Sequence, residues 1–452
     1  MTMGPGDAIW ERFSHNALII RDEDAGTEVA YNWGIFDFSQ DDFIGRLARG
    51  RMLYRMEGYP APALISAYGR WDRDVWLEKV NLTPRQALEL KTLIDETDTD
   101  ANREYRYDYY RDNCSARIRD ALDEVLDGQI RAATEDVDTG TSYRWHTARL
   151  LQPVLWAYAG IQFVVGNRGD ESISAWEEMF LPLRMRDHLL GVRVRTSDGE
   201  DVPLLGPSVQ VVVSSRPPPP DEAPNFLFSF LGAGVLLGVL FVIAGEVAAR
   251  GHRWGQWLLA ATGTAWSGTV GVLGTALVLS WFLTDHFFWG LNENAFQASP
   301  LSLATAVVLL PAALGRGRRV AVCLTRAVVV LSIGGLVLQL LPGFDQVNGE
   351  MLAFMVPAHL GLAWGASRAW TSLRGRFRSA ADGCCQRSPL FFSSARSHRC
   401  ICWFHRSSPS CRSPCGSPTS EPAKTPLGVR LVGAPGSASS TSAFFSTGSR
   451  SP

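Results

Sequence analysis

The chain has 452 residues, of which 46% are hydrophobic and 19% are charged, and its formal net charge is -2. This near balance of charge gives no electrostatic reason to expect nucleic acid as a partner, and no basic stripe interleaved with aromatic residues precedes the C-terminal tail. Of the eight cysteines, Cys114 stands alone before the apolar half of the chain, which excludes a disulfide framework within that part.

A β-hairpin is predicted near the N-terminus. Residues 13–20 and 29–36 read as strands, and a polar turn lies midway between them. That register would set His15 opposite about Gly34 and place Asn32 diagonally on the same face. The alternative interpretation is that His15 is a structural histidine and that Asn32 only forms hydrogen bonds at a strand end.

A helix is predicted to begin near Cys114. Apolar residues recur at helical spacing after it, and Asn113 or Asp112 is a suitable N-cap. The first turn of a helix favours a thiolate through the helix dipole and the free N–H groups. Cys114 is therefore either a nucleophile or a small buried residue. As a nucleophile, with His15 as base and Asn32 as the residue that orients the imidazole, it would complete the three roles of thiol catalysis.

Further polar residues surround this helix start. Arg117 and Arg119 are expected on a solvated helix face, and Tyr107 with Asp108 is expected to support the first turn. Among them, Arg117 and Asp108, together with Asn113, are predicted to support the catalytic groups or to contact substrate.

The second half of the chain contains apolar runs that are long enough to cross a membrane as helices. Five spans are predicted, at residues 226–244, 257–283, 301–314, 320–341 and 351–367. The third is short, and it spans fully only if residues 295–300 extend it. The Gly234-xxx-Gly238 and Gly361-xxx-Gly365 spacings are interpreted as ordinary glycine content rather than as points of close helix contact.

The arginines predict the orientation of these spans. They occupy alternate connections: Arg250, Arg253, Arg316, Arg318, Arg319, Arg368, Arg374, Arg376 and Arg378. By the positive-inside rule these connections and the C-terminus are cytoplasmic, and the N-terminal domain is periplasmic. In the external connection 284–300, His286 is a candidate contact for a lipid headgroup or the lipoprotein cysteine, although the favoured interpretation is a polar loop at the interface. Since the start MTMGPGDAIWERF lacks both parts of an export signal, we expect a signal or anchor upstream.

The predicted organisation is a soluble domain at 1–200, a connector at 201–224, a transmembrane domain at 225–370 and a tail at 379–452. The proline-rich SSRPPPPDEAPN in the connector favours an extended spacer. The tail is rich in Ser, Arg, Cys and Pro without an apolar period, which predicts disorder and is typical of an out-of-frame end. Its Cys400, Cys402 and His405 lack the second ligand pair of a zinc site.

The segments GPGDAIWERFSHNALIIRD, VAYNWGIFDF, LARGRMLYRMEGYP, NLTP and YRYDYYRDNCSARIRD follow one another, and TDHFFWGLNENAFQASPLSL lies between the second and third predicted spans. Over roughly residues 4–370 the chain thereby resembles the Bacteroides-type bacterial lipoprotein N-acyltransferases. The resemblance implies an α+β papain-like domain, a permuted relative of NlpC/P60 peptidases, followed by an all-α five-helix transmembrane domain. It implies His15 as base, Cys114 as nucleophile and Asn32 as third residue, and the family usually has glycine where this chain has Ser14.

The implied reaction moves an acyl chain from a phospholipid, through a thioester on Cys114, to the α-amine of a diacylglyceryl-cysteine apolipoprotein. The implied location is the bacterial inner membrane, with phospholipid, apolipoprotein and membrane lipids as partners. No metal or organic cofactor is implied, and the oligomeric state stays open. Two alternatives are a membrane-anchored thiol hydrolase of peptidoglycan peptides or lipids, in which water replaces the amine, and a non-catalytic module that binds envelope proteins.

Overall fold

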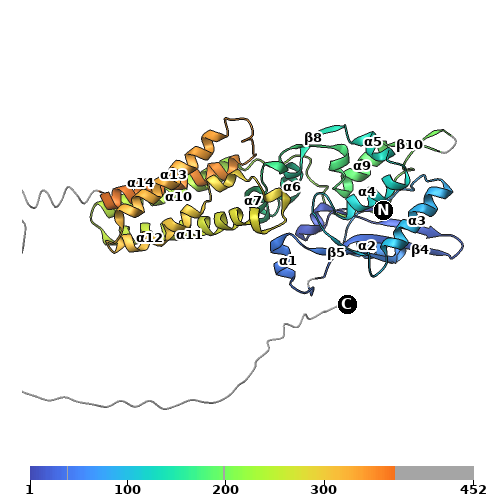
Figure 1. The fold of residues 1–452 in the computed structure, drawn as a ribbon, viewed down its shortest axis with the longest axis horizontal. Helices are drawn as coiled ribbons and strands as arrows, with labels where there is room; N and C mark the ends of the chain where they lie inside the picture. The colour runs from blue at the N-terminus through green and yellow to red at the C-terminus, as the bar shows by residue number, and fades with distance from the viewer. Residues whose placement is uncertain (38, 197–198, 372–452) are drawn as a thin grey trace, which may run out of the picture. The chain divides into compact units, whose positions relative to one another are not determined.

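The computed structural model describes residues 1–37, 39–196 and 199–371. Within them, an α+β region is followed by a helical region, as Figure 1 shows, which confirms the predicted α+β class and the helical second half. The papain-like arrangement and the domain limits at residues 200 and 224 stay predictions. The tail predicted to be disordered, with Cys400, Cys402 and His405, lies outside the described residues.

The strands of the α+β region form small antiparallel sheets. One sheet has the order β12-β6-β1-β2, comprising Val209–Val212, Val75–Leu77, Thr2–Met3 and His15–Asn16. A second has the order β3-β4-β5-β7, comprising Leu18–Asp22, Thr27–Ile35, Leu53–Pro60 and Glu104–Arg106. Two further pairs join β10 (Arg193–Arg195) to β11 (Asp201–Pro203) and β8 (Asp138–Ser142) to β9 (Ser172–Ser174). Because β12 pairs with β6, residues after 200 contribute to the same sheet as the N-terminus.

Helices pack around these sheets. They are α1 (Phe43–Arg49), α2 (Ala61–Arg70), α3 (Pro84–Thr97), α4 (Cys114–Val125), α5 (Gln129–Thr134), α6 (Tyr143–Leu151), α7 (Leu155–Val164), α8 (Ala175–Glu178) and α9 (Pro182–Gly191), with 3-10 turns η1 (Ile9–Phe13) and η2 (Asn167–Gly169). Helix α4 buries Ile118 and Leu122 in the main core, beside Met56 of β5. The apolar period that predicted this helix therefore faces the sheet.

The predicted hairpin is present, but its first strand is interrupted. Strands β3 and β4 pair in the expected register, with Asp22 opposite Thr27. The chain before β3 instead forms η1, which ends at Ser14 with φ 69° and ψ -170°. This turn redirects the backbone, so His15 pairs with Met3 of β1. The expectation that His15 lies opposite Gly34 in the hairpin is therefore wrong.

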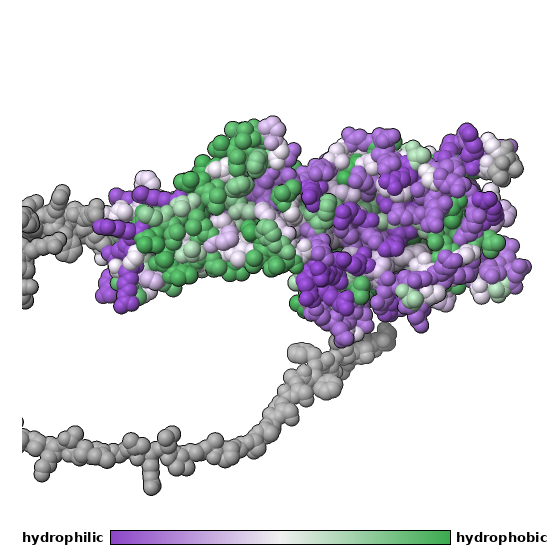
Figure 2. Space-filling model, viewed as in Figure 1, coloured by the Kyte–Doolittle hydropathy of each residue, from purple (hydrophilic) through white to green (hydrophobic). Residues whose placement is uncertain are grey.

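The second half contains the helices α10 (Leu227–Ala249), α11 (Arg253–Leu283), α12 (Pro300–Ala313), α13 (Arg318–Leu338) and α14 (Gly349–Thr371), with η3 (Phe287–Trp289) and η4 (Glu293–Phe296) between α11 and α12. By length and composition, four segments could cross a membrane: 227–249, 253–283, 293–313 and 318–338. The third segment includes η4, so the predicted extension of this span by residues 295–300 is present. The fifth span stays a prediction, because α14 is long enough but is not among these four segments. Figure 2 shows hydrophobic residues over the sides of these helices.

Glycines hold α10 against α14, the helix pair with the most extensive contact. A Cβ at Gly234 would overlap the carbonyl oxygen of Phe354, and one at Gly238 would lie 2.5 Å from the carbonyl oxygen of Pro357. A Cβ at Gly361 would overlap the Gly238 backbone in turn. The interpretation of these glycines as ordinary span composition is therefore wrong, since they allow direct backbone approach.

Candidate active site

A cavity of about 770 Å³ lies at the junction of the α+β and helical regions. Its wall includes His15 and Cys114 from the α+β region, and His286 and Trp289 from the connection between α11 and α12. The volume is in the range of small-molecule sites. Because two predicted catalytic side chains share this space, it is the candidate site.

His15 is oriented by an amide whose own direction is fixed. The Nδ2 group of Asn32 donates to the carbonyl oxygen of Ala30 at 3.1 Å. This leaves Oδ1 facing His15 Nε2, at 3.2 Å. Since an amide oxygen only accepts, Nε2 must carry the proton in this contact and Nδ1 is left as the basic nitrogen. The structure thus brings together the predicted base and its predicted orienting residue.

Cys114 occupies the first position of α4. Asn113 is the N-cap, and its Oδ1 accepts hydrogen bonds from the amides of Ser115 and Ala116, each at 2.9 Å. Gly34 passes directly beside the thiol: a Cβ there would lie 3.5 Å from Cys114 Cβ and 4.0 Å from His15 Cε1. The backbone of Gly34, at φ 93°, therefore passes close to both Cys114 and His15.

Burial, rather than the helix terminus, dominates the ionisation of the thiol. Cys114 is 8% exposed, and burial raises its pKa to about 11. Hydrogen bonds from the backbone amides of Asn16, Ser115 and Cys114 itself act in the opposite direction. The expectation of a thiolate is therefore wrong for this state, because desolvation outweighs the helix N-terminus. The same amides are placed to stabilise negative charge when the proton leaves.

The imidazole is also uncharged in this state. Burial, followed by the nearby positive charge of Arg73, lowers the pKa of His15 to about 4, and the hydrogen bond with Asn32 opposes this. Arg73 is 4% exposed and lines the cavity, where its Nε donates to the Gly4 carbonyl oxygen at 2.8 Å. Sequence reasoning missed Arg73, which lies distant in sequence from both catalytic motifs.

The predicted supporting residues have distinct positions. Asp108 lines the cavity, and its Oδ1 accepts from the amides of Tyr110 and Arg111, so it shapes the turn before α4. Arg117 pairs with Asp112 and lies 4.4 Å from the Tyr105 ring, outside the cavity lining. It therefore stabilises the helix start without reaching the reacting groups.

Arg119 is buried, although the sequence predicts it on a solvated helix face. Its exposed fraction is 7%. Its guanidinium lies 3.8 Å from the Trp176 ring and donates to the Trp176 carbonyl oxygen at 2.7 Å. The planar, delocalised charge of arginine tolerates this stacked burial.

The connection between α11 and α12 lines one side of the cavity. His286 stacks on Trp289 with ring centroids 3.9 Å apart, and its Nε2 lies 3.1 Å from the Leu47 carbonyl oxygen. The adjacent Asp285 forms ion pairs with Arg51 at 2.8 Å and Arg106 at 2.6 Å. His286 thus joins the α+β region to the membrane helices rather than forming part of a free polar loop.

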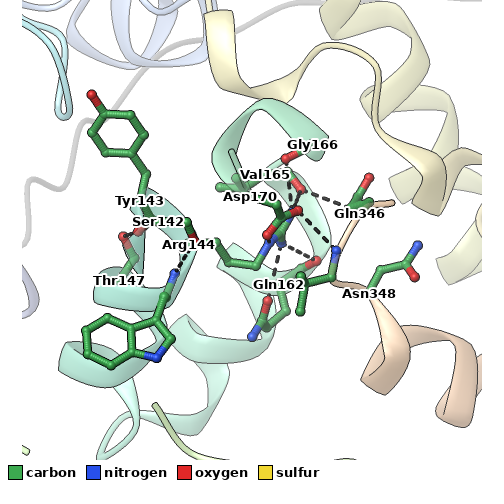
Figure 3. A network of polar contacts seen from close by, with 12 residues as sticks. Ser142, Tyr143, Arg144, Thr147, Gln162, Val165, Gly166, Asp170, Gln346 and Asn348 are labelled. Carbon is green, nitrogen blue, oxygen red and sulfur yellow. Dashed lines mark hydrogen bonds and ion pairs between the residues drawn. The ribbon is translucent and has the colours of Figure 1, made fainter. Parts of the chain in front are cut away.

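A buried polar network fixes α7 to the same junction (Figure 3). Arg144, which is 2% exposed, donates from Nη2 to the carbonyl oxygens of Val165 at 2.6 Å and Gly166 at 3.0 Å, and pairs with Asp170. Gln346, from the loop before α14, donates to the same Val165 carbonyl oxygen at 3.1 Å. The C-terminal end of α7 is therefore capped from both halves of the chain.

Two asparagines of the external loop complete this cap. Asn292 donates to the carbonyl oxygens of Phe163 and Val164, each at 2.9 Å. Asn294 donates to those of Gln162 and Phe163, each at 3.0 Å. Both side chains are buried, so they are structural contacts and not headgroup ligands. Within the described residues, no group of three or more His, Cys, Asp or Glu side chains is placed to hold a metal ion.

Fold and site together describe an α+β region joined to apolar helices long enough to cross a membrane, with Cys114 and His15 on one cavity and Asn32 bonded to His15. Residues 1–153 match the family described as the Lnb N-terminal periplasmic domain. This match supports the resemblance to Bacteroides-type apolipoprotein N-acyltransferases and a periplasmic location of the domain. No curated protein and no solved structure matches the chain.

Proposed function

We propose that this protein is an inner-membrane apolipoprotein N-acyltransferase with Cys114 as nucleophile, His15 as base and Asn32 as orienting residue. One observation carries the proposal: thiol, oriented imidazole and the external loop of the membrane helices line a single cavity. A cysteine nucleophile, a histidine base and an orienting asparagine are the three groups that papain-like enzymes use, which supports these roles. The match of residues 1–153 supports the same reaction.

The uncharged resting state favours proton transfer during attack. As Cys114 Sγ bonds to the ester carbonyl carbon of a phospholipid, His15 Nδ1 takes the thiol proton. His15 then returns this proton to the departing alkoxide, which leaves as a lysophospholipid and completes the thioester. The amides of Asn16 and Cys114, which already point at the sulfur, lie next to the charge that develops in this step.

The second step restores the enzyme. The α-amine of a diacylglyceryl-cysteine attacks the thioester carbon, and His15 takes the proton from the amine. Sγ leaves with the bonding electron pair and receives that proton, so the thiol is regenerated as the amide forms. Both substrates are lipids, which agrees with a cavity built partly from the external loop of membrane helices. The proposed topology has a periplasmic N-terminal domain and a cytoplasmic C-terminus.

The test is mass spectrometry of lipoprotein N-terminal peptides from cells that depend on the full chain. Wild type and the control Cys323→Ser, whose side chain lies in α13 outside the cavity lining, are expected to give an amide-linked third acyl chain. Cys114→Ser should give none. Free fatty acid with no amide product in wild type would overturn the transferase in favour of a hydrolase. An acyl amide in Cys114→Ser would overturn the nucleophile.

A further inference from the structure

Helix α7 is unusually apolar for a helix outside the membrane spans. Its sequence LWAYAGIQFV contains no charge, yet at ten residues it is too short to cross a bilayer. Two large side chains at its start are largely exposed, Leu155 at 57% and Trp156, which lines the cavity, at 73%. Together they give the start of α7 an exposed apolar surface.

One face of α7 forms a wall of the cavity that holds the thiol. The lining residues are Trp156, Ala157, Gly160, Ile161 and Val164. Their spacing repeats every three to four residues, so they form one continuous stripe along the helix. The stripe is apolar throughout, whereas His15, Arg73 and Asp108 lie elsewhere on the cavity wall. An apolar stripe that shares a cavity with a nucleophile is suited to the hydrocarbon part of a substrate.

Polar contacts between α7 and its surroundings hold this wall in place. The carbonyl groups at the end of α7 are capped by Arg144, Asn292, Asn294 and Gln346, as described above and seen in part in Figure 3. In the first half of α7, the Tyr158 hydroxyl donates to Glu350 at the start of α14, at 2.8 Å. The helix is therefore held in register against the membrane helices, which a length-selective surface requires.

Gly160 leaves open space in the middle of the stripe. A Cβ added there meets nothing within 4 Å. Glycine in a helix interior is less stable than alanine by about 1 kcal/mol, so its presence is not explained by helix formation. We propose that the α7 stripe binds the acyl chain being transferred and that the space at Gly160 sets the chain length accepted. This inference rests on the proposed function, because it names the substrate part that reaches Cys114.

The test uses Gly160→Leu in the full-length protein, reconstituted with an equal mixture of short-chain and long-chain phosphatidylglycerol and a diacylglyceryl peptide acceptor. Gly191→Leu is the matched control, since a Cβ at Gly191 also meets nothing within 4 Å and Gly191 is not part of the cavity wall. Filling the space with four carbons should change the short-to-long product ratio by about tenfold or more. The control ratio should stay that of wild type. An unchanged ratio in Gly160→Leu would overturn the inference.

A second readout separates this inference from the proposed function. A phospholipid with a photoactivatable acyl chain is expected to label the peptide that contains residues 155–164, and less so in Gly160→Leu than in Gly191→Leu. If wild type forms no amide product but the label falls on this peptide, the transferase proposal fails and the acyl subsite stands. If amide product forms and the label falls elsewhere, the subsite is wrong and the transferase stands.

Discussion

Alkylation of Cys114 tests whether the thiol rests in its neutral form. Burial raises its pKa to about 11. At pH 7.5 such a thiol is ionised in roughly 1 molecule in 3,000, against about 1 in 10 for an ordinary cysteine, so ionisation alone slows reaction with iodoacetamide by about 300-fold. Limited access to a side chain that is 8% exposed slows the reaction further, but equally at every pH.

The pH dependence is therefore the diagnostic quantity. For the folded protein in detergent, carbamidomethylation of the Cys114 peptide is followed by mass spectrometry, with Cys114→Ser to confirm the assignment. The rate should rise about tenfold per pH unit between pH 7 and 9 without a plateau. Rapid labelling at pH 6, or a plateau by pH 8, would mean that the thiol ionises far below pH 11 and would refute the argument from burial.

Three further predictions follow from single positions. Ser14→Gly should raise the thermal unfolding midpoint, corresponding to about 1 kcal/mol, because φ 69° strains a side-chain-bearing residue; an equal gain in Ser14→Ala would contradict this cause. Arg73→Gln should move the acid limb of the kcat/KM profile to higher pH, because loss of the positive charge raises the pKa of His15 from about 4. Arg73→Lys keeps the charge and should leave the acid limb in place, so identical limbs for the two variants would argue against the charge effect. Gly238→Ala should destabilise the helical region by about 1–3 kcal/mol in a detergent unfolding assay. The control Gly232→Ala should not, because a Cβ there meets nothing within 4 Å, and equal effects of the two substitutions would show that packing is not the cause.

Local sequence patterns predicted several elements correctly. The turn between residues 22 and 27 follows from side-chain chemistry that acts over a few residues, and so does the N-cap, which was expected at Asn113 or Asp112 and lies at Asn113. The contact of His15 with Asn32 was also predicted, although from a pairing of His15 with Gly34 that the structure does not contain. The contact forms nevertheless, because Asn32 lies on β4 as predicted and the turn at the end of η1 places His15 beside it.

Long-range effects were not predictable in this way. The thiol pKa depends on how completely the fold excludes water from Cys114, and no local motif encodes that balance. Arg73 reaches the site only because β6 and β1 bring distant segments together. The close approach at Gly238 depends on the partner helix α14, so the glycine spacing alone did not distinguish contact from composition.

The loop carrying Asp285 and His286 has a consequence for the fate of the proposed intermediate. A thioester faces two competing nucleophiles, the intended amine and water, and their relative access decides between an acylated product and a wasted turnover. By bonding to Arg51 and Leu47, this loop holds residues of the helical half against one side of the cavity. If the proposed function holds, loss of these contacts should open the thioester to water and shift the acyl group from the amine product toward free fatty acid.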